Sequence, residues 1–304
     1  MTISSLSTAQ IAALSTTAIQ SLSSTTLSSF AATQIAAISA TGVGALSNSQ
    51  VAALSATQVK AFTTTQIPNF SSDVSFSSAQ LLALNDVQLG AFTGTLVANI
   101  NATTVAAFAT TQIQAFSAAN ISALDETQAG ALTTTQISSL TTGQVAGLTA
   151  TDIGELSTQQ ASAFTATQIA RLSDTAVAAF DATTFGQLTT TQIKALTTTQ
   201  IASLDAADLG EFTATQIAAL ATTQVRAIAA TNMTAFNETQ IGAFTSAQLQ
   251  ALSNTSLAAL ADTQIAALST AQASSLTASQ ITALDATNVA EFTAAQLHSF
   301  SGTQ

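Results

Sequence analysis

The chain has 304 residues, of which 15 are acidic, four are basic and one is histidine, so its formal net charge at pH 7 is −11. With so few basic residues the sequence lacks the positive stripe that binds nucleic acid or an anionic membrane surface. The absence of cysteine excludes disulfides, thiolate metal ligands and thiol catalysis. Mean hydropathy is +0.42, but we find no run of about 18 apolar residues to span a membrane and no signal peptide.

An eight-residue unit repeats along the chain and starts each time with a large apolar residue. After a lead-in over residues 1–5, residues 6–69 are regular octets, beginning with the one that runs from Leu6 to Ala13. Residues 70–75 shorten the register, and Pro68 just before them predicts an early helix end and a local kink. Residues 76–304 then keep one register, so the sequence predicts a single repeat solenoid over residues 1–304.

Three local structures compete for the octet. A β-solenoid suits the threonine content, but a strand would point octet positions 1 and 6 to opposite faces. It would also need corner residues, and the chain has only 12 glycines and one proline. One continuous helix would let its apolar stripe drift by about 80° per octet. A chain of very short helices satisfies every constrained position.

The octet contains the signals that start a helix. Counted from the large apolar residue, position 2 is usually Ser, Thr, Asp or Asn, which are preferred at a helix N-cap. Position 5 is mostly Gln and closes a capping box with it, as in Ser7 and Gln10, while positions 1 and 6 form a hydrophobic staple, as in Leu6 and Ile11. We therefore predict an all-α solenoid with one capped helix per octet over positions 3 to 8. Positions 1 and 6 would form its core, and positions 3 and 7 would be exposed.

Charge is distributed as a helix dipole predicts. Eleven of the 15 acidic residues fall at positions 2, 3 or 5, near the expected helix N-terminus. All four basic residues fall at position 7 or 8, in the expected last turn: Lys60, Arg171, Lys194 and Arg226. The exceptions are three acidic residues at position 8, namely Glu155, Glu211 and Glu291.

Position 4 is threonine in most octets, and capping does not explain it. One interpretation is a half-buried threonine that packs between neighbouring helices. The other is a regular face that orders water, contacts ice or another ordered surface, or stacks one solenoid on another. The candidate surface stripe consists of Thr111, Thr135, Thr167, Thr191, Thr199, Thr215 and Thr223.

Residues with catalytic or metal-binding chemistry are few. His298 has no cysteine or second histidine with which to build a zinc site or a catalytic triad. Two acidic sets have a spacing of three that calcium binding or paired-carboxylate hydrolysis would use, although capping explains most of it. These sets are Asp205, Asp208 and Glu211, and Asp152 and Glu155. We expect no catalytic residue, no cofactor and no metal site.

The octets Thr197–Leu204 and Thr213–Leu220 resemble the "TTQIAAL" octapeptide arrays of large bacterial extracellular or surface proteins. The resemblance extends over almost the whole chain and implies a bacterial origin, an extracellular or cell-surface location and a stalk or fibre role. Near-identical units also predict self-association, head to tail or side by side. The alternative function is a binding module that uses the threonine stripe, and an enzyme is the third hypothesis.

Overall fold

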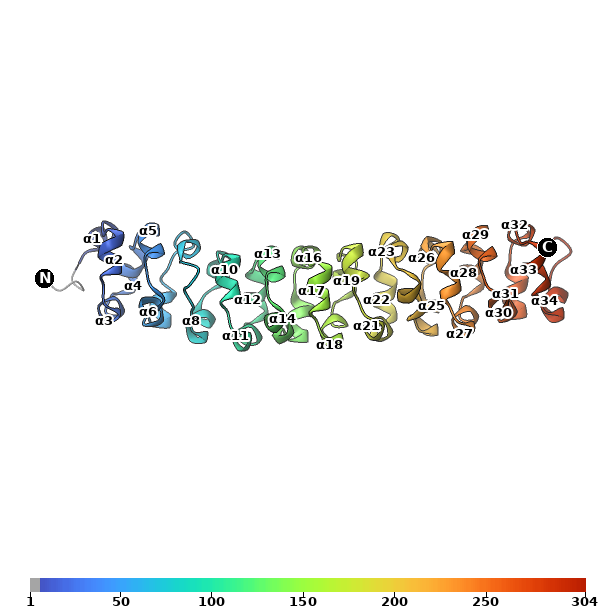
Figure 1. Cartoon of the computed structure of the whole chain (residues 1–304), viewed down its shortest axis with the longest axis horizontal. Helices are drawn as coiled ribbons and strands as arrows, with labels where there is room; N and C mark the ends of the chain where they lie inside the picture. The colour runs from blue at the N-terminus through green and yellow to red at the C-terminus, as the bar shows by residue number, and fades with distance from the viewer. Residues whose placement is uncertain (1–5) are drawn as a thin grey trace. The chain divides into compact units, whose positions relative to one another are not determined.

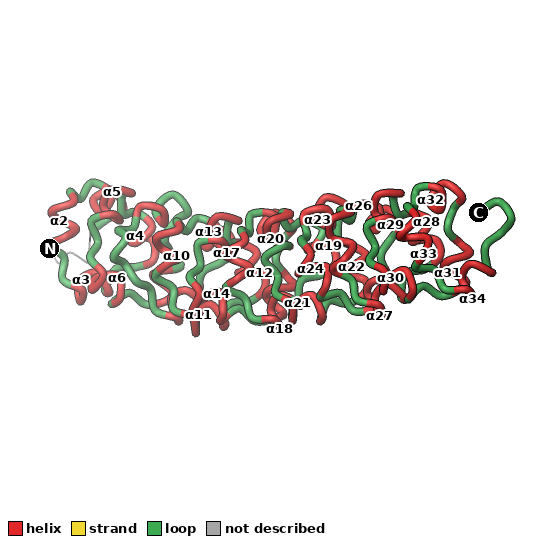
Figure 2. Tube along the Cα trace, turned by 45° about the vertical axis from the view of Figure 1, so that its right-hand side comes forward, coloured by secondary structure: helices red, strands yellow, loops and turns green. Residues whose placement is uncertain are grey.

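The computed structural model describes residues 6–304, which form short helices and contain no strand. Each complete octet forms one helix, which has four to six residues except in octet 62–69, where it has three, and short extended links join successive helices (Figures 1 and 2). Contacts divide the chain after Leu148 into two compact units, here unit 1 and unit 2. Within each unit the helices form successive turns, so the prediction of an all-α solenoid with one helix per octet is confirmed. A single solenoid over residues 1–304 stays a prediction.

The corners between helices are built from two extended residues. Between α8 (Ser78–Ala83) and α9 (Asp86–Gly90), Leu84 has φ −68° and ψ 143°, and Asn85 has φ −83° and ψ 169°. The Asn85 side chain accepts the Gln88 N–H over 2.9 Å, which starts the next helix. No described residue has a positive φ, so these corners need no glycine.

Three octets complete one turn, because each helix packs against the helix about 24 residues further along. The helices of each unit therefore lie in three rows, in which successive members stack on one another. The first row of unit 1 holds α1 (Thr8–Ala12), α4 (Ala32–Ala36), α7 (Ala56–Val59), α8, α11 (Ala102–Ala107) and α14 (Glu126–Ala131). The second holds α2 (Thr16–Gln20), α5 (Ala40–Gly44) and η2 (Ile67–Asn69), then α9, α12 (Thr110–Ala115) and α15 (Thr134–Ser139). The third holds α3 (Ser24–Ser28) and α6 (Asn48–Ala52), then the non-helical residues 70–77, and then α10 (Gly94–Ala98), α13 (Ala118–Ser122) and α16 (Thr142–Ala146).

Unit 2 has the same three-row plan. Its first row holds α17 (Ala150–Gly154), α20 (Asp174–Val177), α23 (Thr198–Ser203), α26 (Thr222–Ala227), α28 (Ser246–Ala251), α31 (Thr270–Ser275) and α34 (Ala294–His298). The second holds α18 (Thr158–Ala161), α21 (Ala182–Gln187), α24 (Ala206–Gly210), η3 (Ala230–Ala235), α29 (Asn254–Ala258) and α32 (Ala278–Thr282). The third holds α19 (Ala166–Ile169), α22 (Thr190–Ala195), α25 (Ala214–Ala219), α27 (Glu238–Gly242), α30 (Asp262–Ala266) and α33 (Ala286–Ala290).

Positions 1 and 6 of the octets fill the interior of both units, as predicted. In α25 the position 6 residue Ile217 is fully buried, and Leu220, which starts the next octet, is 4% exposed. Phenylalanines at position 1 also meet edge to face: the rings of Phe236 and Phe244 lie 5.5 Å apart at 82°. Such a pair contributes about 0.5–1.5 kcal/mol beyond the burial of its area. Positions 3 and 7 are mostly exposed, so the predicted core is confirmed.

The predicted charge distribution is also confirmed. Four aspartates are N-caps whose carboxylates accept the N–H three residues on, namely Asp125, Asp181, Asp205 and Asp285. Lys194 and Arg226 lie in the last turns of α22 and α26, and Lys60 is the C-cap of α7. Each group therefore lies near the helix end whose dipole attracts it.

A glutamine at position 5 connects each turn to the turn before it. In α25, Gln216 Oε1 accepts the Thr213 N–H over 2.7 Å, which confirms the predicted capping box. Its Nε2 donates to two main-chain carbonyls of the preceding turn, those of Leu188 and Phe185, each over 2.7 Å. These acceptors lie 28 and 31 residues earlier, and Gln216 is only 3% exposed. Both ends of the amide are therefore satisfied inside the protein.

We call this repeated set of Nε2 bonds the glutamine ladder. A bond to the carbonyl 28 residues earlier is made by Gln34, Gln50, Gln58, Gln66, Gln112, Gln128, Gln136, Gln144, Gln192, Gln200, Gln216, Gln224, Gln240, Gln248, Gln264, Gln272, Gln280, Gln296 and Gln304. A glutamate would close the capping box equally well, but an ionised carboxylate has no proton to donate. The ladder thus explains why position 5 is an amide in most octets.

The irregular segment of unit 1 replaces helices with turns. Pro68 lies in the short 3₁₀ helix η2, and residues 70–77 are not helical. The Ser75 N–H donates to Asn48 Oδ1 over 2.9 Å, so this segment packs next to α6. Gln80 and Gln88 then reach carbonyls only 26 residues earlier. The ladder therefore continues past the segment after a turn that is two residues shorter.

Candidate functional site

The seven threonines predicted to form a surface stripe are all exposed, and none has the half-buried position of the packing interpretation. The three-row plan distributes them over several faces instead of one. Thr111 and Thr135 lie on α12 and α15 of unit 1. In unit 2, Thr167, Thr191 and Thr215 share one row, and Thr199 and Thr223 share another.

One row of unit 2 carries an exposed threonine at position 4 of every helix. We call this set the threonine row; it consists of Thr167, Thr191, Thr215, Thr239, Thr263 and Thr287. The other two rows of the unit are interrupted, for example by Ala207 and Ala247. Comparison of successive octets misses this set, because residues on one face are 24 positions apart. A search at that spacing would have found Thr239, Thr263 and Thr287.

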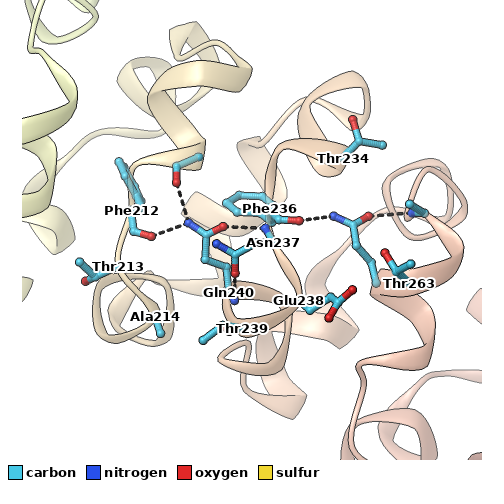
Figure 3. Close-up of a pocket in the computed structure, with 13 residues that line it drawn as sticks. Phe212, Thr213, Ala214, Thr234, Phe236, Asn237, Glu238, Thr239, Gln240 and Thr263 are labelled. Carbon is cyan, nitrogen blue, oxygen red and sulfur yellow. Dashed lines mark hydrogen bonds between the residues drawn. The ribbon is translucent and has the colours of Figure 1, made fainter.

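An open groove of about 630 Å³ in unit 2 has part of the threonine row in its wall (Figure 3). The helix starts of α25, α27 and α30 contribute to it, and Thr234 of η3 also lines it. Thr239 and Thr263 are the members of the threonine row on its wall. The groove therefore presents hydroxyl and methyl groups, with Glu238 as the charged side chain among its lining residues.

The Asn237 and Gln240 side-chain amides that line the groove already form hydrogen bonds within the protein. Asn237 Oδ1 accepts the Gln240 N–H over 2.9 Å, and Gln240 Oε1 accepts the Asn237 N–H over 2.7 Å. Gln240 Nε2 donates to the carbonyls of Gly210 and Phe212, and Figure 3 shows these two hydrogen bonds of the glutamine ladder as dashed lines. The threonine hydroxyls that line the groove can both donate and accept hydrogen bonds.

The other candidate residues have structural positions. His298 is exposed in the last turn of α34, as predicted. Asp205 and Asp208 exchange capping hydrogen bonds, and Glu211 is the C-cap of the same helix, α24. Residues 6–304 contain no group of three His, Cys, Asp or Glu side chains placed to hold a metal ion. The spacing of three that suggested a calcium site is used for capping.

Two aspartates have shifted pKa values. Burial raises the pKa of Asp208 because it disfavours the charged form, and the nearby Asp205 carboxylate adds to the effect, while a hydrogen bond from the Asp205 N–H opposes it. Hydrogen bonds from the Thr184 hydroxyl and N–H lower the pKa of Asp181, because they stabilise its carboxylate. Neither residue lines the groove.

Residues 105–142 match the family model of the ALTTAQ repeat, a segment that runs from α11 into α16. The match supports a repeat-type protein and covers a minor part of the chain. A comparison with curated proteins found no match. None of the helices in residues 6–304 has the length and apolar character that a membrane span requires.

Proposed function

We propose that this chain is a non-enzymatic structural repeat protein that assembles with copies of itself, as a stalk or filament subunit on a bacterial cell surface. The observation that carries the proposal is the uniform interface between turns. Each turn presents the same carbonyl acceptors and apolar side chains to the next one, which contributes the same glutamines. Such an interface is complementary to itself, so a turn of one copy fits a turn of another. Repeated head-to-tail contacts of this kind produce open filaments.

The stacking face of α33 and α34 has exposed apolar side chains. Val289 of α33 is 38% exposed and Leu297 of α34 is 44% exposed, although position 6 is buried in most other octets. A further turn stacked on this one, from the same chain or from a second copy, would bury both side chains. Burial of a leucine stabilises a contact by about 1.5–3 kcal/mol before the cost of association.

Assembly is tested by sedimentation velocity over a wide range of protein concentration, with electron microscopy of the same samples. We expect larger species as concentration rises, and their loss in Leu297→Glu. The matched control is Thr263→Glu, which places the same charge on the side of a turn. Loss of assembly in Thr263→Glu alone would indicate side-by-side association, and a strictly monomeric wild-type chain at high concentration would overturn the filament proposal.

The surface location rests on the resemblance of the octets to bacterial surface arrays, so it has its own test. Intact cells that express the chain are treated with protease, and the chain is followed by immunoblot beside a cytoplasmic marker. Digestion of the chain while the marker survives is the expected result. Protection of the chain until the cells are lysed would contradict it.

The threonine row favours a second candidate function, binding to ice or to another ordered surface. Six exposed threonines at one-turn spacing would present methyl and hydroxyl groups at regular intervals. Thermal hysteresis is the measurement, with Thr191→Lys and Thr215→Lys as disrupting changes. Thr199→Lys and Thr223→Lys on the neighbouring row are the matched controls. Absence of hysteresis in the wild-type chain would remove this candidate.

A further inference from the structure

Two octets of unit 2 carry a carboxyl group instead of an amide at position 5, namely Asp152 in α17 and Asp208 in α24. Position 5 of α24 is Asp208, whose Oδ2 accepts the Asp205 N–H over 3.0 Å. In return the Asp208 N–H donates to Asp205 Oδ1 over 3.0 Å, so the capping box is intact. The carbonyl that lies 28 residues earlier belongs to Phe180, at the corner between α20 and α21. An ionised Asp208 cannot donate a hydrogen bond to it.

Two asparagines show that a side chain of this length reaches the ladder carbonyl. Asn120 Nδ2 donates to the carbonyl of Phe92, 28 residues earlier, over 2.8 Å. Asn232 Nδ2 donates to the carbonyl of Leu204, also 28 residues earlier, over 2.9 Å. Aspartate has the same length as asparagine, and a neutral carboxyl has one O–H donor. Protonation of Asp208 would therefore supply the missing donor.

We propose that Asp208 forms a proton-dependent connection in the glutamine ladder, which we call the joint. Protonated Asp208 donates a hydrogen bond to the Phe180 carbonyl, and ionised Asp208 leaves this carbonyl without a ladder bond. Oδ2 keeps its bond from the Asp205 N–H in both states, and Oδ1 carries the proton. The joint makes the attachment between α24 and the preceding turn dependent on pH. It is independent of the proposed assembly function.

Burial is the main cause of the raised pKa of Asp208, and the negative charge of Asp205 adds to it. Its own helix carries Asp205 and Glu211 at its two ends. The elements of the preceding turn contribute Asp174 of α20 and Asp181, the N-cap of α21. η3, which packs on the other side of α24, has no titratable side chain. All the charged groups of these elements are acidic.

The sign of the pH dependence follows from this raised pKa. The folded state binds more protons than the unfolded state between the unfolded value near 3.8 and the higher folded value. The contribution of Asp208 to stability is therefore fully present below the unfolded pKa and is lost as pH rises through the folded pKa. This direction is opposite to that of a carboxylate stabilised in its charged form.

The test compares the full-length chain with Asp208→Asn, which carries a permanent amide donor. The opening equilibrium of α24 is measured by native-state hydrogen exchange between pH 3.5 and pH 8. We expect the variant to open roughly 2- to 12-fold less often than the wild type at pH 7, the range that one net hydrogen bond allows. Below the unfolded pKa the difference should disappear, because Asp208 then donates as well.

The matched control is Asp262→Asn in the first turn of α30, where the aspartate lies at exposed position 3 and not at the ladder position 5. Carboxyl ¹³C NMR of the wild type should give Asp208 a titration midpoint above the ordinary range of aspartate. A difference between Asp208→Asn and wild type that is the same at every pH overturns the proposal. An ordinary midpoint for Asp208, or a variant that opens more often at pH 7, does so too.

Discussion

At the scale of single residues, the position 5 glutamine has two functions at once. Its oxygen caps its own helix, and its nitrogen binds the carbonyls of the preceding turn. The site is almost fully buried, and a buried polar group without a partner costs about 1–3 kcal/mol. The choice between amide and acid at this position therefore has a large effect on the free energy of unfolding.

We predict that Gln216→Glu lowers the free energy of unfolding of unit 2 by about 3 kcal/mol or more at pH 7, since it sets a buried carboxylate against two carbonyls. The loss should be smaller near pH 4, where the new carboxyl is partly protonated. Urea denaturation followed by circular dichroism measures both. Gln216→Asn is the control, because asparagine at this position can keep the bond 28 residues back, and it should cost only about 1 kcal/mol. Equal losses in the two variants would contradict the ladder.

At the scale of the helix, the cap and staple residues determine where each element begins. Five helix starts have alanine at the N-cap and so lack the side-chain acceptor that the other octets have: Ala31, Ala109, Ala221, Ala229 and Ala261. At Ala221 the glutamine half of the capping box is still present, since Gln224 Oε1 accepts the Ala221 N–H over 2.7 Å. These positions are incomplete caps that substitution can restore.

We predict that Ala221→Thr raises the free energy of unfolding by about 0.5–2 kcal/mol, because threonine supplies the missing acceptor for the Gln224 N–H. Chemical denaturation is the measurement. Ala202→Thr at exposed position 7 of α23 is the control and should be neutral or slightly destabilising, since threonine has a lower helix propensity than alanine. Equal effects at the two positions would argue against side-chain capping.

The sequence was sufficient to predict helix starts, core positions and charge placement, because each depends on contacts within one octet, such as Ser7 with Gln10. It did not reveal the number of octets per turn. Because the octets are so similar, the 24-residue period of one turn cannot be distinguished in the sequence from the 8-residue repeat. The second bond of Gln216 joins residues 28 positions apart and was missed for the same reason. The threonine row follows from that period, so only part of the candidate site was predicted.

At the scale of the whole molecule, stability and surface pattern depend on different periods. Stacking needs only complete octets, since any regular octet can pack against whichever regular octet lies three octets further along the chain. The set of side chains on one face is preserved only when complete turns are removed, because a shift of one octet moves every later helix to a different row. Removal of octets should therefore separate the fold from any function of the threonine row.

We predict that deletion of residues 212–219, one octet, preserves cooperative thermal unfolding but disrupts the threonine row. Thr223 would follow Thr191 in that row, and the next positions would be Ala247, Ala271 and Ala295. Deletion of residues 212–235, one full turn, should preserve both the fold and the row. Deletion of residues 212–215 breaks the octet and should unfold the neighbouring helices. Circular dichroism and the hysteresis assay together distinguish these cases, and equal behaviour of the first two deletions in both assays would contradict the three-row plan.

The corners without left-handed residues have a consequence for the history of the chain. Because no junction between the helices of residues 6–304 needs a specialised residue, recombination between similar repeats can add or remove octets without creating a defective junction. Two similar segments are 56 residues, or seven octets, apart and lie on different rows: Asp152 to Glu155 on α17, and Asp208 to Glu211 on α24. Duplication of a block of octets changes which side chains share a face but leaves the stacked helices intact. Length can therefore vary freely in steps of eight residues, and each step gives selection a new surface to act on.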